Sequence, residues 1–100
     1  MTRTVWKYDI NVKDAAAELG IVIALPAQAK FLASAFQYST AFVTTWFEVN
    51  PDMPKVRRRF QLFGTGHPID DGLSYLSSHS LHSGELILHL YQATEGEITG

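Results

Sequence analysis

The sequence predicts a mainly β fold: a small antiparallel β-sandwich or barrel of six to seven strands with at most one short helix. Short runs rich in β-branched and aromatic residues recur along the chain. Turn signals made of Gly, Pro, Asn, Asp and Ser separate these runs. The 100 residues, 46% of them hydrophobic, suffice for one core. We therefore expect a single β domain over residues 1–93 and a polar, flexible C-terminal tail over residues 94–100.

The first third of the chain begins with a strand and a local turn. Residues 4–10, TVWKYDI, are β-branched and aromatic and form the first expected strand. Residues 14–19 favour a short helix or turn, because Ala, Glu and Leu support helices and Gly20 ends them. A second strand is expected over residues 20–25, where Pro26 stops it.

Two further strands are expected over residues 31–37 and 41–49, around the polar turn of residues 38–40. Residues 27–36 also fit a helix, because Ala, Gln, Lys and Leu all tolerate one. The sequence leaves strand and helix open for this segment.

The second half repeats the strand pattern. Residues 50–54 contain two prolines and end the fourth strand, and residues 55–63 form the fifth. Residues 73–81 and 85–92 flank Ser83-Gly84, a two-residue signal for a β-hairpin.

The hairpin register follows from its turn. If Ser83-Gly84 is the turn, Leu81 faces Leu86 and His79 faces Leu88. One set of residues then forms the core face: Leu73, Tyr75, His79, Leu81, Leu86, Leu88 and Leu90. Leu76 falls on the other face, and His79 is expected to be a hydrogen-bonded histidine of the core.

Composition and charge exclude several classes of protein. The chain has no cysteine, so it has neither disulfides nor thiolate sites. The longest uncharged run, residues 31–47, is interrupted by polar side chains, so we expect no membrane span. A net charge of −2 does not favour nonspecific nucleic-acid binding.

The charge is unevenly distributed along the chain. Residues 1–60 hold all eight Lys and Arg with five acids, a net +3, whereas residues 61–100 hold five acids and neither Lys nor Arg, a net −5. Because opposite halves attract, a homo-oligomer is one expectation.

The densest positive charge is the run KVRRR. On a strand, alternation places Lys55, Arg57 and Arg59 on one face, with neighbours about 6.8 Å apart, and Arg58 on the other. Arginines at this spacing suit phosphates or carboxylates. A solvated strand face is the alternative for the aligned cations. Arg58 lies between apolar neighbours, so if buried it needs a carboxylate partner or an anionic ligand.

The stretch FGTGHPIDDG, residues 63–72, is the strongest loop signal. Gly64 and Gly66 allow positive φ and close backbone approach, and Thr65 and His67 supply polar side chains. The loop matches neither a Walker motif nor a dinucleotide fingerprint. It is either a structural corner or an anion cradle, so residues 64–67 are candidate ligand contacts.

Enzymatic signatures are weak. The sequence contains no Gly-x-Ser-x-Gly elbow, and we expect no catalytic residues and no cofactor. His82 and His89 lie about 13 Å apart along one strand face, too far to share a metal ion, so no metal site is expected. A small hydrolase using His67 and Asp70 is a remaining alternative.

Two kinds of partner fit a binding protein. A nucleotide site needs cations with aromatics, and Trp46 and Trp6 are candidates beside the arginines, within one chain or across subunits. A protein partner needs an exposed apolar patch, for which Phe36, Tyr38 and Phe42 near a hairpin tip are candidates.

Several segments, taken together, carry a family resemblance: Trp6-Lys7-Tyr8, residues 25–32, Trp46 with residues 49–54, Arg58-Arg59-Phe60, GTGHPI at residues 64–69, and residues 84–91. They resemble a family of small phage- and prophage-encoded domains of unknown function, and the resemblance spans most of residues 5–92. GTGHPI is its most specific part, and the insertion of residues 12–20 departs from the family pattern. The resemblance implies a phage protein with a compact, mainly β domain, and we expect this protein to act in the host cell cytoplasm.

This setting favours a non-enzymatic binder that counters or modulates a host defence system. It would bind a host protein or sequester an anionic nucleotide signal. A virion or assembly accessory protein is the alternative.

Overall fold

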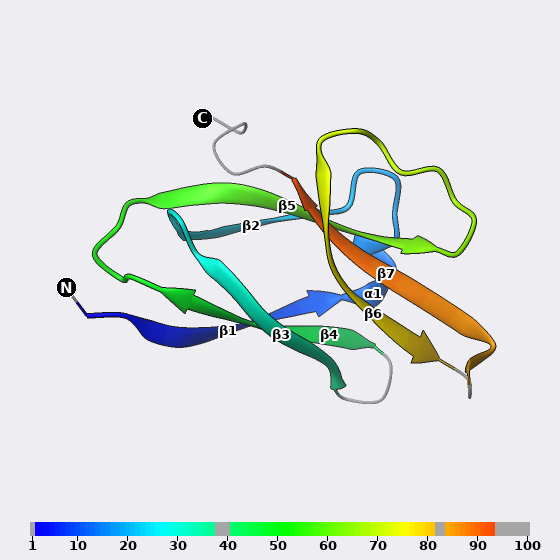
Figure 1. The fold of residues 1–100 in the computed structure, drawn as a ribbon, viewed down its shortest axis with the longest axis horizontal. Helices are drawn as coiled ribbons and strands as arrows, with labels where there is room; N and C mark the ends of the chain where they lie inside the picture. Colours follow the sequence, from blue (N-terminus) through cyan, green and yellow to red (C-terminus); the bar gives the residue numbers. More distant parts are fainter. Residues whose placement is uncertain (1, 38–40, 82–83, 94–100) are drawn as a thin grey trace.

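The computed structural model describes residues 2–37, 41–81 and 84–93. In chain order the elements are β1 (Thr4–Asn11), α1 (Val12–Ala15), β2 (Ile21–Pro26), β3 (Lys30–Gln37), β4 (Phe42–Val49), β5 (Lys55–Gly64), β6 (Leu73–Leu81) and β7 (Leu86–Ala93) (Figure 1). The predicted mainly β fold with one short helix is confirmed. The predicted tail, residues 94–100, lies outside the described residues.

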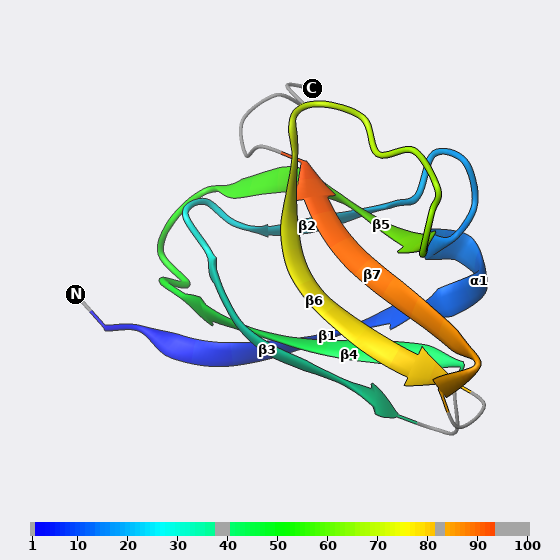
Figure 2. The same cartoon turned by 45° about the vertical axis from the view of Figure 1, so that its right-hand side comes forward.

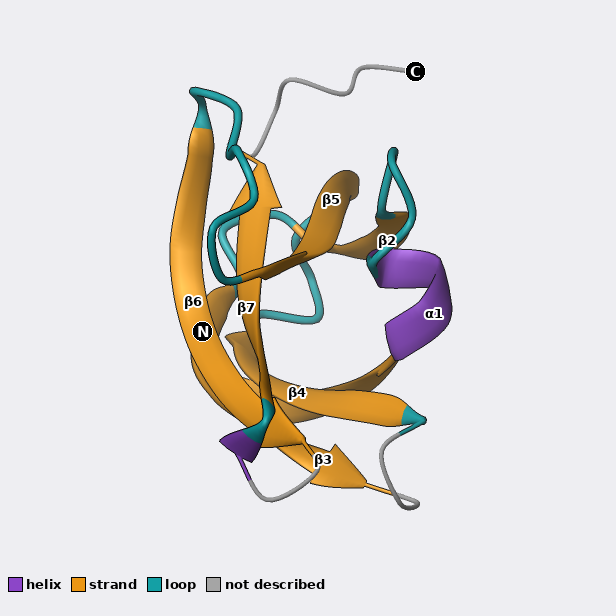
Figure 3. Ribbon diagram, turned by 90° about the vertical axis from the view of Figure 1, so that its right-hand side faces the viewer, coloured by secondary structure: helices purple, strands orange, loops and turns teal. Residues whose placement is uncertain are grey.

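The strands form two antiparallel sheets. Sheet A has the order β1-β4-β3, and sheet B has the order β2-β5-β7-β6. The two sheets face each other as layers of a sandwich (Figures 2 and 3). Over the described residues they do not close into a barrel, so the sandwich alternative is the correct one.

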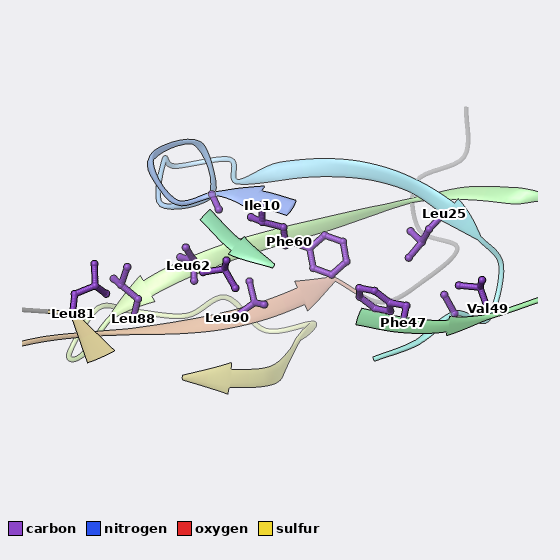
Figure 4. Close-up of a cluster of buried hydrophobic side chains, with 12 residues drawn as sticks. Ile10, Leu25, Phe47, Val49, Phe60, Leu62, Leu81, Leu88 and Leu90 are labelled. Carbon is purple, nitrogen blue, oxygen red and sulfur yellow. The ribbon is translucent and has the colours of Figure 1, made fainter. Parts of the chain in front are cut away.

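The core fills the space between the sheets. Period-two alternation points Ile10, Val43 and Phe47 inward from sheet A, and Leu25, Phe60, Leu62 and Leu90 inward from sheet B (Figure 4). The rings of Phe47 and Phe60 meet across the layers with centroids 5.8 Å apart. Each large apolar side chain buried here stabilises the fold by about 1.5–3 kcal/mol.

The helix begins earlier than the predicted segment, residues 14–19. Asn11 caps α1 by accepting the Asp14 N–H at 3.0 Å, so the helical turn starts at Val12 and ends at Ala15. The chain then enters β2 through Gly20, whose φ is +68°. A Cβ at Gly20 would lie 2.3 Å from the Phe60 carbonyl oxygen, so only glycine fits this approach.

Residues 27–36 resolve to a turn followed by strand β3, and not to a helix. Pairing with β4 shifts register between Phe31 and Ala33, which leaves Leu32 as a bulge. After the bulge, Ser34 and Phe36 face the core side. The predicted turn of residues 38–40 lies outside the described residues.

The β6–β7 register is confirmed, with Leu81 opposite Leu86 and His79 opposite Leu88. The predicted faces of Tyr75 and Leu76 are wrong, and Leu86, expected on the core face, is 42% exposed. A register shift between Tyr75 and Ser77 makes Leu76 a bulge, so Leu76 packs on the core and Tyr75 turns outward, 56% exposed. Of the predicted turn, Ser83 lies outside the described residues and Gly84 has φ +91°.

Residues 65–72 connect β5 to β6 past the intervening strand β7 (Figures 1 and 2). Since β5 and β6 are both antiparallel to β7, they run parallel to each other, and this crossover loop must return along the sheet. None of the described helices is long and apolar enough to span a membrane.

Candidate ligand-binding face

The outer face of sheet B presents two arginines from β5. Arg57 and Arg59 point outward, while Arg58 between them is buried, as the alternation predicted. Ala24 lies directly opposite Arg57 and Val22 opposite Arg59 on β2. Alternation places both side chains on this face, with their Cα atoms about 6.8 Å apart along the strand.

Gln61 positions Arg59. The Arg59 Nη1 donates to Gln61 Oε1 at 3.1 Å, and Gln61 Nε2 donates to the Glu18 carbonyl at 2.8 Å. Gln61 is itself buried under the segment that follows α1. This chain of contacts restrains a guanidinium that would otherwise sample many rotamers. Gln61 was not a predicted site residue, because its anchor lies 43 residues away in sequence.

Three aromatic rings continue the same face across the sheet. The Tyr91 ring meets the Phe63 ring and the Tyr75 ring edge to face, each pair with centroids 5.6 Å apart. Tyr91 lies opposite Gln61, so it is the diagonal neighbour of Arg59, a spacing of about 7–8 Å in antiparallel sheets. We call Arg57, Arg59, Gln61, Tyr75 and Tyr91 the arginine–tyrosine face.

A hydrogen-bond network borders this face. His89 Nδ1 lies 2.7 Å from Ser78 Oγ, and His89 Nε2 lies 3.0 Å from Thr65 Oγ1. The Tyr75 hydroxyl lies 2.8 Å from Ser78 Oγ. Both nitrogens of His89 are therefore engaged, and the imidazole ties the start of the crossover loop to strands β6 and β7.

The GTGH segment forms a turn closed by its own histidine. His67 donates its backbone N–H to the Gly64 carbonyl at 3.2 Å, and the Gly64 N–H donates to His67 Nδ1 at 3.3 Å. Gly66 has φ +90°, which favours glycine. The backbone N–H groups of Gly64 and His67, which could belong to an anion cradle, are therefore hydrogen-bonded within the turn. The segment acts as a structural corner.

The arginines and this turn do not form one small site. Arg59 and Gly64 are five residues apart on β5, about 17 Å along the strand. Thr65 contacts His89, which borders the arginine–tyrosine face. The side chain of His67 instead packs over Gly64. Ligand contact by Gly64, Gly66 and His67 stays a prediction.

Arg58 lies in the core and is only 4% exposed. Its Nη1 donates to Gln92 Oε1 at 3.0 Å and its Nη2 donates to the Ala29 carbonyl at 3.1 Å. The guanidinium carbon lies 5.6 Å from the centroid of the Phe47 ring. Arg58 therefore packs and hydrogen-bonds within the core, and its side chain does not lie on the arginine–tyrosine face.

Trp46 lies on the opposite side of the molecule. It points outward from sheet A, where Lys7 and Ala33 flank it in register, and Trp6 packs against the core instead. Within one chain, the two tryptophans therefore do not join the arginines.

Phe36 and Phe42 of the predicted apolar patch do not lie on the same face of the molecule. The Phe36 ring faces inward and meets the His79 ring at 5.0 Å, and Phe42 is half-buried on the outer face of sheet A. Tyr38 lies outside the described residues. Exposed apolar area on sheet A comes instead from Val5 and Leu32, at 52% and 44% exposure.

His79 joins the two sheets at their β3 and β6 edges. Its Nε2 lies 2.7 Å from Ser34 Oγ, which lies 2.6 Å from Ser77 Oγ. Burial lowers the pKa of the His79 imidazole. The expected hydrogen-bonded histidine on the core side is confirmed.

The alternative catalytic pair lies in the crossover loop. His67 and Asp70 are both exposed, and His67 Nδ1 is occupied by the Gly64 N–H. Among the residues with described positions, no three His, Cys, Asp or Glu side chains gather to hold a metal ion.

Comparison with known proteins identifies one family. Neither the curated proteins nor the solved structures contain a match to this chain. A family model described as Domain of unknown function (DUF7352) matches residues 1–99. Since the match covers nearly the whole chain, the protein belongs to the DUF7352 family of domains of unknown function.

Proposed function

We propose that this protein is a non-enzymatic binding protein that sequesters an anionic nucleotide on its arginine–tyrosine face. The observation that carries the proposal is the shared exposed face of Arg59, held by Gln61, and the Tyr91–Tyr75 ring pair. Phosphate oxygens would bind Arg57 and Arg59, and the base would stack on the exposed ring of Tyr75.

The chemistry of these side chains suits such a ligand. Guanidinium groups bind phosphate through paired, charge-assisted hydrogen bonds. Stacking of a base on an aromatic ring contributes about 1–3 kcal/mol. Because Gln61 already orients Arg59, less side-chain freedom is lost on binding. Tight binding of this kind requires no bond to be broken.

The biological role we propose rests on the resemblance of the WKY and GTGHPI segments to phage-encoded domains. A phage protein that withdraws a nucleotide signal in the host cytoplasm would counter a host defence system that depends on the signal. Recovery of the protein from purified phage particles would instead favour the virion accessory role.

A nucleotide panel tests the proposed function. We expect linear or cyclic nucleotides to raise the melting temperature, and Arg57→Ala with Arg59→Ala to weaken binding about five- to tenfold per arginine. Both arginines are surface residues, so the double variant should keep its fold within about 1 kcal/mol. Titration calorimetry measures the affinity.

Lys7→Ala is the matched control, because Lys7 is an exposed cation on the outer face of sheet A. It should bind like the wild type. If no nucleotide in the panel shifts the melting temperature of the wild type, the proposal is wrong.

A host protein is the second candidate partner, favoured by the exposed Val5 and Leu32 on sheet A, where Trp46 also faces outward. Capture of a specific host protein that Trp46→Ala prevents, and Arg57→Ala does not, would support this reading.

A further inference from the structure

A cavity of about 320 Å³ lies at the end of the sandwich opposite the GTGH turn. There the N-terminal end of the chain, the β2–β3 turn and the β4–β5 loop come together, at the left of Figure 1. The cavity is separate from the arginine–tyrosine face, since its walls come mainly from sheet A and these two connections.

The walls of this cavity are tied together by hydrogen bonds. The Ala27 N–H donates to the Pro54 carbonyl at 2.8 Å, which joins the β2–β3 turn to the β4–β5 loop. Behind the turn, the buried Arg58 holds the Ala29 carbonyl at 3.1 Å. The β4–β5 loop is closed by the Met53 N–H on the Asn50 carbonyl at 3.0 Å. The cavity is therefore preformed.

Gln28 lines the cavity with a rare backbone conformation. Its φ of +65° is the only positive value at a non-glycine among the described residues. Such a conformation costs on the order of 1–3 kcal/mol and is concentrated at ligand-binding sites. The hydrogen bonds around the turn maintain it.

The charged side chains that line the cavity indicate the charge of the ligand that it would bind. Arg3 Nη1 lies 3.0 Å from Glu48 Oε1, so these two charges neutralise each other. Lys30 is opposite Glu48 in register, yet in the described part of the chain no ion pair to it is found. The lining therefore carries one net positive charge, while Ala27 and Met53 provide apolar contacts.

We propose that this cavity binds a small organic monocarboxylate, with the carboxylate at Lys30 and the apolar body against Ala27 and Met53. A nucleotide phosphate fits less well, because the Glu48 carboxylate repels multiple negative charges. The volume lies at the small end of the range for ligand sites, about 300–1,000 Å³.

Protein NMR with defined probes tests this site. Butanoate, hexanoate and phenylacetate are titrated into ¹⁵N-labelled protein, with the matching primary amides as uncharged probes. We expect saturable amide shifts confined to residues 27–30 and 48–53 for at least one acid, and binding of its amide at least about tenfold weaker.

Lys30→Gln should weaken binding of the same acid about tenfold, while Lys13→Gln on α1 should leave it unchanged. Glu48→Gln should tighten it, because a like charge is removed. Retained dispersion of the spectrum checks the fold of each variant, and Lys30→Arg, which keeps the charge, should retain binding.

Three results would overturn the proposal: no acid gives saturable shifts, the amide binds as well as its acid, or Lys30→Gln binds like the wild type. Shifts at the arginine–tyrosine face instead would assign the acids to that other site. The nucleotide proposal uses different residues and is unaffected by each of the first three.

Discussion

At the scale of single residues, His79 hydrogen-bonds across the two sheets, and its burial opposes protonation of the imidazole. It lies between sheets A and B, with Ser34 and Ser77 as hydrogen-bonding neighbours and the Phe36 ring against it. These neighbours are uncharged, so nothing among them compensates a positive imidazole. Protonation of His79 would therefore place a charge at the joint between the sheets.

This arrangement predicts a pH-dependent stability. Burial lowers the pKa of His79 below its unfolded value of about 6.5. The contribution of neutral His79 is therefore fully present above about pH 6.5 and is lost as the pH falls toward the lowered folded pKa. Urea unfolding at about pH 7.5 and about pH 5.5 should show lower stability of the wild type at the acidic value.

His79→Gln should reduce this loss of unfolding free energy, because the titrating group is gone. His67→Gln, a change at an exposed histidine, should preserve it. An equal decrease in wild type and His79→Gln would show that other groups cause the pH dependence.

At the scale of elements, the crossover loop of residues 65–72 depends on its anchors. Thr65 is held by His89, and the GTGH turn is closed by His67. Because all eight loop residues are exposed, these contacts restrain a segment with little buried area of its own.

We predict that His89→Ala loosens this loop without unfolding the sandwich. The change removes the contacts to Thr65 and Ser78, each contributing about 0.5–1.5 kcal/mol. An Asp-directed protease should then cut at Asp70 or Asp71 about five- to tenfold faster, as mapped by mass spectrometry. Ile87→Ala, on the same strand and face, is the control and should be cut like the wild type.

At the scale of the whole molecule, the charge asymmetry of the sequence becomes a spatial one. Residues 61–93 supply the end of β5, the crossover loop, β6 and β7, coloured yellow-green to orange-red from the centre to the right of Figure 2. All Lys and Arg lie before residue 61, at Arg3, in β1, α1 and β3, and in the first half of β5. Two copies would attract each other through unlike surfaces, in a head-to-tail arrangement.

We predict salt-sensitive self-association. Light scattering after size exclusion should give a mass above that of one chain at low ionic strength, and the mass of one chain in about 0.5 M salt, where screening acts within a few ångströms. A single-chain mass at every ionic strength would remove charge asymmetry as a cause of assembly.

Local chemistry in the sequence determined the β class, the approximate strand positions, the alternation of Arg57 and Arg59 against Arg58, and the Leu81–Leu86 register. Each depends on neighbours along the chain or on one hairpin turn, so period-two geometry suffices. The helix begins at Val12 and not at residue 14, because a single side-chain hydrogen bond to the N-cap Asn11 decides where a short helix begins.

The tertiary structure alone decided the rest. A one-residue bulge at Leu76 reversed the faces of Tyr75 and Leu76, and so created the aromatic part of the arginine–tyrosine face. The anchors of Gln61 and Arg58 are at least 29 residues away in sequence. Such contacts form only when the two sheets pack together, and no local pattern encodes which distant carbonyl a buried donor will meet.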